Sequence, residues 1–115
     1  MRKYITLEKI SETREKVIKF SIEYFKGYYG FPRGIYLNVQ PMTLKYDTIQ
    51  GENYVTESYQ HGTGYSLLVR PLSRVSTKQI KIIGDKLFPE AENIIRFFQE
   101  GKKEELKQLV TTLTA

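Results

Sequence analysis

The sequence predicts an α+β fold: an N-terminal helix, then a four-stranded antiparallel meander, then two to three C-terminal helices packed on one face of the sheet. Three observations support this fold class. Apolar residues recur with a helical period over the first 26 residues, alternate with polar residues between residues 35 and 70, and return to a helical period after residue 76. The chain has 115 residues and no linker-like or repeated segment, so we expect one domain that spans residues 1–115.

The first helix is expected over residues 6–26. Thr6 is a suitable N-cap residue, because its hydroxyl can accept a hydrogen bond from the first helical turn. Glu12 precedes Lys16 at the i,i+4 spacing that favours an ion pair along a helix. The apolar residues that fall on one face of a helical wheel are Ile10, Val17, Ile18, Tyr24, Phe25 and Tyr28.

The middle of the chain alternates with period two, which predicts strands over residues 35–40, 42–46, 54–59 and 65–70. Pro41 is expected to end the first of these strands and Pro71 the last. Turn residues at 50–53 and 61–64 leave only short connections, which predict antiparallel neighbours. The side chains expected to face the helices are Ile35, Leu37, Val39, Met42, Leu44, Tyr65, Leu67 and Val69.

The C-terminal part is expected to be helical. Ser76 begins a capping-box pattern. Gly84 stands in the apolar stripe of this helix at a cost of about 1 kcal/mol in helix propensity, so we expect a close approach of the helix to the sheet there. Pro89 suits the start of a second helix and Gly101 its end, and a last amphipathic helix is expected through residues 106–113.

The composition excludes several classes of chemistry. The chain has no cysteine, so disulfides, thiolate catalysis and cysteine-bound zinc are excluded. The single histidine, His61, is expected in an exposed turn with no orienting partner. Asp47 and Glu57 lack the lysine two residues later that a metal-dependent nuclease would need, so we interpret them as ordinary strand charges. We expect no catalytic residue, no metal and no cofactor, and an enzyme is the least favoured class.

The cellular location is inferred from what the sequence lacks. Residues 1–3 are followed by alternating polar and apolar residues, which do not form the apolar segment of a signal peptide. The longest aliphatic runs are too short to cross a bilayer. Together with the absence of cysteine, these features predict a cytoplasmic location and no membrane partner.

An aromatic segment follows the predicted first helix. Residues 26–31 read Lys-Gly-Tyr-Tyr-Gly-Phe, which departs from the RNA-recognition signature by one inserted tyrosine. Pro32 stands where that signature needs a continuing strand. We therefore interpret the segment as an aromatic turn that ends the helix.

The net charge of +5 and the outward face of the predicted sheet suggest a polyanionic partner. Tyr36, Asn38, Lys45, Leu68 and Arg70 are expected to point away from the helices, with Arg33 and Arg74 at the ends of the strands. Aromatic and cationic side chains on an open sheet are typical of nucleic-acid binding. The first hypothesis is therefore a non-enzymatic nucleic-acid-binding protein, with contacts from Arg33, Tyr36, Lys45, Arg70 and Arg74.

The second hypothesis is a protein-interaction module, such as a small inhibitor, an assembly factor or a virion component. Tyrosine and arginine are also enriched at protein interfaces, so the same composition fits it. The sheet face or the last helix would then bind a protein, and a homo-oligomer is compatible with either hypothesis.

Overall fold

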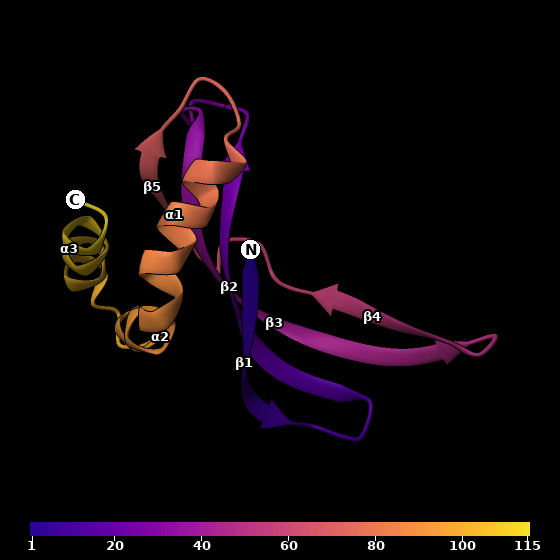
Figure 1. Cartoon of the computed structure of the whole chain (residues 1–115). Coiled ribbons are helices and arrows are strands. Elements are labelled where there is room, and N and C mark those ends of the chain that lie inside the picture. The colour runs from indigo at the N-terminus through magenta and orange to yellow at the C-terminus, as the bar shows by residue number, and fades with distance from the viewer.

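The strands precede all the helices in the computed structural model, which describes residues 1–115 (Figure 1). The five strands form one antiparallel sheet and are β1 (Arg2–Lys9), β2 (Arg14–Phe25), β3 (Gly34–Ile49), β4 (Glu52–Ser58) and β5 (Tyr65–Pro71). The helices that follow are α1 (Thr77–Leu87), a 3₁₀ turn (Phe88–Glu90), α2 (Ala91–Gln99) and α3 (Lys103–Leu113). None of these helices is long and apolar enough to cross a membrane.

The predicted N-terminal helix is wrong, because residues 2–25 form the antiparallel hairpin β1–β2. Over a short window the apolar residues of β2 fit both the helical period and the strand period of two. A helical wheel therefore does not distinguish a helix from a strand here. β2 is enriched in β-branched and aromatic residues and pairs with β1 on one side and β3 on the other. Pairing with strands that are distant in sequence therefore decides the conformation of this segment.

The four-stranded meander is also wrong, because the segments predicted as strands 35–40 and 42–46 are one continuous strand, β3. One edge of β3 pairs with β5 through residues 34–39 and with β4 through residues 43–49. Pro41 lies in the gap between these two partners, so its missing N–H leaves no ladder bond unmade on that edge. The carbonyl of Pro41 accepts a hydrogen bond from Gln40 Nε2 at 2.8 Å.

The helices cover one face of one half of the sheet, which we call the covered half (Figure 1). Ile35, Leu37 and Val39 face the helices as predicted and belong to a core of 13 buried residues. The remaining members of that core are Ile18, Phe20, Ile22, Ile83, Leu87, Ala91, Ile94, Ile95, Leu106 and Val110. The C-terminal helices thus pack on one sheet face, as the sequence predicts.

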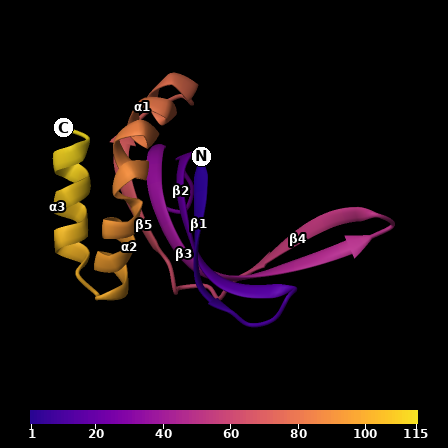
Figure 2. The same cartoon turned by 60° about the horizontal axis from the view of Figure 1, so that its bottom comes forward.

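The β1–β2 and β3–β4 hairpins extend beyond the helices, and we call their far ends the arm (Figure 2). Met42 and Leu44 were expected to face the helices, but they form a separate cluster with Val17 and Tyr4. Because β3 keeps its period of two through Pro41, its even-numbered residues lie on the face opposite the helices. The buried face of β3 therefore changes where the helices end.

The capping signal of the C-terminal part is confirmed, whereas the prediction for Gly84 is wrong in its partner. The Ser76 side chain caps α1 by accepting a hydrogen bond from the backbone N–H of Gln79 at 3.2 Å. Gly84 does mark a close approach, although to the start of the chain rather than to a strand. A Cβ at Gly84 would lie 2.5 Å from the Met1 sulfur, so glycine lets Met1 pack against α1.

Candidate nucleic-acid interface

The five predicted contact residues do not share one face of the sheet. Arg70 was expected to point away from the helices, and this is wrong. Its guanidinium donates hydrogen bonds to Gln79 Oε1 at 2.8 Å and to the Thr114 carbonyl at 3.1 Å, on the helix side. A bulge in the β3–β5 ladder places Arg70 opposite Ile35, and this extra residue changes the face to which Arg70 points.

Lys45 and Tyr36 are also placed differently from the prediction. Lys45 lies on the arm, on the face opposite to Tyr36, and its Nζ is 3.7 Å from a carboxylate oxygen of Asp47. Tyr36 does point away from the helices, but it is only 6% exposed. Its hydroxyl donates to the Pro32 carbonyl at 2.8 Å, and its ring packs edge-on against Phe25. Tyr36 therefore supports the surface and does not offer a free ring face.

Arg33 lies in the β2–β3 loop and Arg74 in the β5–α1 segment, and these two connecting segments meet at the end of the covered half (Figure 1). The backbone N–H of Leu72 donates to the Arg33 carbonyl at 3.2 Å, which joins the β2–β3 loop to the β5–α1 segment. Residues 26–34 and 71–78 contain four cations, Lys26, Arg33, Arg74 and Lys78, and no acidic residue. None of the four cations is in an ion pair. We call this surface the basic end.

The aromatic segment of the basic end is a tight turn, as predicted, but it joins two strands rather than ending a helix. The backbones of Tyr28 and Phe31 hydrogen-bond to each other in both directions, at 3.3 and 3.0 Å. Tyr29 and Gly30 between them adopt positive φ angles of 47° and 83°. The turn leaves Tyr29 84%, Tyr28 63% and Phe31 60% exposed. The sequence did not predict these residues as a site, because Tyr28 fits the apolar face of the expected helix and the others fit a turn at its end.

A recess of about 240 Å³ opens beside this turn on the sheet face away from the helices. Phe25, Phe31 and Tyr36 form its aromatic wall, with edge-on contacts of 5.8 and 6.5 Å between ring centres. Glu23, which is exposed and in no ion pair, lines the recess together with Asn38. The Asn38 side-chain oxygen accepts a hydrogen bond from Ser66 at 2.7 Å. The recess thus combines stacking surfaces with a carboxylate and an amide.

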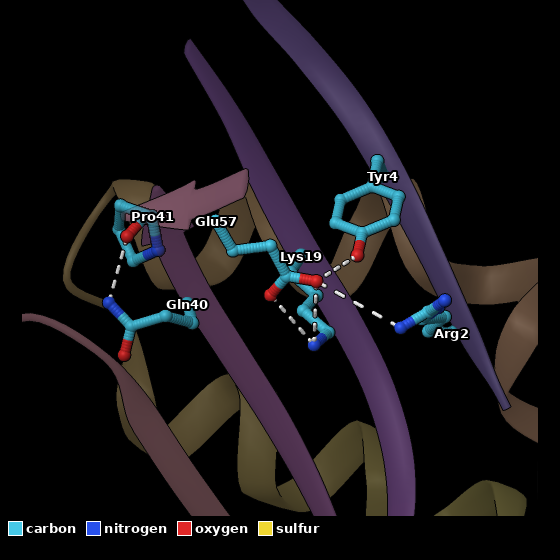
Figure 3. A network of polar contacts seen from close by, with 6 residues as sticks. All are labelled: Arg2, Tyr4, Lys19, Gln40, Pro41 and Glu57. Atoms are coloured by element: carbon cyan, nitrogen blue, oxygen red, sulfur yellow. Dashed lines mark hydrogen bonds and ion pairs between the residues drawn. The ribbon is translucent and has the colours of Figure 1, made fainter. Parts of the chain in front are cut away.

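A larger hollow of about 620 Å³ continues along the same face, and Glu57 is among the residues that line it. Figure 3 shows the polar contacts of Glu57. Glu57 accepts a hydrogen bond from the Tyr4 hydroxyl at 2.5 Å and pairs with Lys19 at 3.1 Å and Arg2 at 3.9 Å. The Tyr4 hydrogen bond and the nearby Lys19 ammonium lower the pKa of Glu57, although desolvation opposes them. Burial and the same hydrogen bond raise the pKa of Tyr4. Because Glu57 neutralises Lys19 and Arg2, this hollow offers less free positive charge than the basic end.

His61 lies in an exposed turn, as predicted, where its ring meets the edge of Tyr59. Nowhere does the structure gather three or more histidine, aspartate or glutamate side chains in positions to hold a metal ion. No family model, curated protein or solved structure matches this chain.

Proposed function

We propose that the protein binds single-stranded nucleic acid at the basic end. One observation carries the proposal: two joined segments carry exposed Tyr28, Tyr29 and Phe31 together with four unpaired cations, and neither segment has an acidic residue. Exposed aromatic rings stack on unpaired bases, and cations beside them neutralise the phosphates. A single strand, whose bases are free to stack, fits such a surface better than a duplex does.

The recess extends the same surface to base edges. A base that enters it stacks on the Phe31 ring. Glu23 then accepts hydrogen bonds from the base, and the amide nitrogen of Asn38 donates one. Because nucleobases present both donors and acceptors on their edges, a paired acceptor and donor can discriminate between them. Lys26, Arg33, Arg74 and Lys78 would meanwhile bind the backbone without regard to sequence.

The proposal is tested by fluorescence anisotropy with a labelled single strand of about 12 nucleotides, titrated at several salt concentrations. Arg33→Ala is expected to weaken binding and to lower the salt slope by about one unit, because one phosphate contact is lost. Tyr29→Ala is expected to cost about 1–3 kcal/mol of binding with an almost unchanged slope, because stacking releases no counterions.

Lys9→Ala is the matched control, since Lys9 is an exposed cation at the far end of β1. It is expected to bind like the wild type. Failure of the wild type to bind at low salt would refute the proposal. Equal losses from Lys9→Ala and Arg33→Ala would show that net charge alone attracts the strand and that the basic end is not the site.

A further inference from the structure

The sheet has three strands with an unpaired edge, and they differ in how that edge is protected. β1 carries a bulge between Thr6 and Glu8 and exposes Lys3 and Lys9. β5 also contains a bulge, ends at Pro71 and has α3 packed beside it. Bulges, lysines, prolines and covering helices are the devices that prevent one sheet edge from pairing with another. β4 has none of these four features, and its charged side chains are Glu52 and Glu57.

β4 is a regular, exposed strand with the composition of a pairing strand. Its seven residues match β3 without a register shift, and they include no lysine, arginine or proline. Tyr54 and Val55 are large apolar side chains that remain about half exposed. A strand with this composition and an open edge is suited to adding another strand.

The β3–β4 turn fixes which backbone groups of β4 are free. Gln50 and Gly51 have φ angles of 53° and 79°, as in a two-residue hairpin turn with both φ positive. Ile49 and Glu52 next to the turn are then a hydrogen-bonded pair, and bonding alternates along the strand. The N–H and C=O groups of residues 53, 55 and 57 therefore point away from β3, toward solvent.

We propose that β4 pairs antiparallel with β4 of a second copy of this chain, about a twofold axis at Val55. This register uses all seven residues and sets outward-bonding residues opposite each other. It also places Asn53 opposite Glu57 and Tyr54 opposite Thr56, and Glu52 falls opposite Ser58. An amide or hydroxyl therefore faces each carboxylate. A shift by one residue would set Glu52 opposite Glu57. It would also set outward-bonding residues opposite residues that bond to β3, so the alternation of bonding directions excludes it.

The free edge of β4 pairs better with β4 of a second copy than with β1 of a second copy. Pairing of acidic β4 with basic β1 of another copy would be favourable in charge, but the bulge and the two lysines of β1 oppose it. The symmetric β4 pair closes on itself and joins both sheets into one. It leaves the basic end of each copy free, and it stands whether or not that end binds nucleic acid.

Because the chain has no cysteine, crosslinking through introduced cysteines tests the axis directly. In Val55→Cys the two Cα atoms would lie about 5.5 Å apart, within the range of a disulfide. Oxidation is expected to give a covalent dimer in nearly all molecules. Asn53→Cys is the matched control, since its two copies would be separated by about 13 Å along the strands. Equal crosslinking of both variants, or none of Val55→Cys, would overturn the proposal.

Light scattering of the unmodified chain gives an independent test. The wild type is expected at twice its monomer mass of 13.5 kDa. Val55→Pro removes an outward N–H that the β3–β4 ladder does not use, so it is expected to be a folded monomer, whereas Val55→Thr keeps the N–H and the dimer. Circular dichroism verifies that both variants are folded. A monomeric wild type, or a folded dimer of Val55→Pro, contradicts the proposal.

Discussion

The covered half and the arm share strands β2 and β3 but are stabilised in different ways. In the covered half, three helices bury a core of 13 residues against the sheet. In the arm the buried cluster has only three residues, Val17, Met42 and Leu44, and a polar network around Glu57 joins β1, β2 and β4. Hydrophobic burial therefore dominates one half, and hairpin pairing with polar contacts holds the other.

This difference separates the two proposed surfaces. The basic end lies at the end of the covered half, next to the larger core. The β4 edge lies on the part with the least core, where a second copy would add backbone hydrogen bonds and apolar contacts. Binding and self-association are thereby assigned to opposite ends of the same sheet.

The largest effect is expected from removing a core side chain of the covered half. Phe20 is fully buried, and its ring packs edge-on against Phe88 with 5.1 Å between ring centres. Phe20→Ala is expected to cost about 3–5 kcal/mol of unfolding free energy. Leu44→Ala in the arm should cost about 2 kcal/mol, because a three-residue cluster collapses more easily around the vacancy. Urea denaturation measures both, and equal losses would contradict the contrast between the halves.

A smaller effect is expected at Arg70, where the predicted and observed roles differ. Its bonds to Gln79 and Thr114 tie β5 to α1 and to the end of α3. Arg70→Ala should therefore lower the free energy of unfolding by about 2 kcal/mol, since both bonds involve a charged donor. The affinity of Arg70→Ala for single-stranded nucleic acid, and the slope of that affinity against salt concentration, should match those of the wild type. A loss of affinity without a loss of stability would restore Arg70 to the binding surface.

The sequence predicts the parts of the fold that local signals decide. The Ser76 cap, the helical conformation of the C-terminal part and the alternation of residues 35–39 are predicted correctly, because each depends on neighbours in the chain. The β1–β2 hairpin is not predicted correctly, because its apolar pattern fits a short helix equally well. Only pairing with β3 decides that this segment is a strand. The gap between β4 and β5 at Pro41 and the bulge near Arg70 likewise depend on which strands pair.

The candidate site follows the same rule. Arg33 and Arg74 were predicted at strand ends, and a backbone hydrogen bond from Leu72 to Arg33 joins the two segments that carry them. Tyr28, Tyr29 and Phe31 were interpreted as a turn, which is right, but no local signal shows that a turn will leave its rings exposed. Tyr36 has a strand pattern typical of an outward residue, yet Phe25 and the Pro32 carbonyl enclose it.

The smallest effect is expected from the carboxylate of the arm, and its size depends on pH. The folded-state pKa of Glu57 is lowered, so its contribution is present above the ordinary carboxyl pKa of about 4.3 and is lost as pH falls through the folded pKa. Glu57→Gln should cost at most about 1 kcal/mol at neutral pH, because the ion pairs are partly exposed to solvent.

Below the folded pKa of Glu57 the wild type carries a neutral carboxyl there, and the difference from Glu57→Gln should disappear. Urea denaturation at neutral pH and at successively lower pH values through the acid range follows how this difference shrinks. Glu8→Gln is a suitable control, since Glu8 forms only an exposed pair with Lys16 at 3.9 Å. A Glu57→Gln loss that persists at acid pH would mean that the side chain acts through packing, and the arm would then resemble the covered half after all.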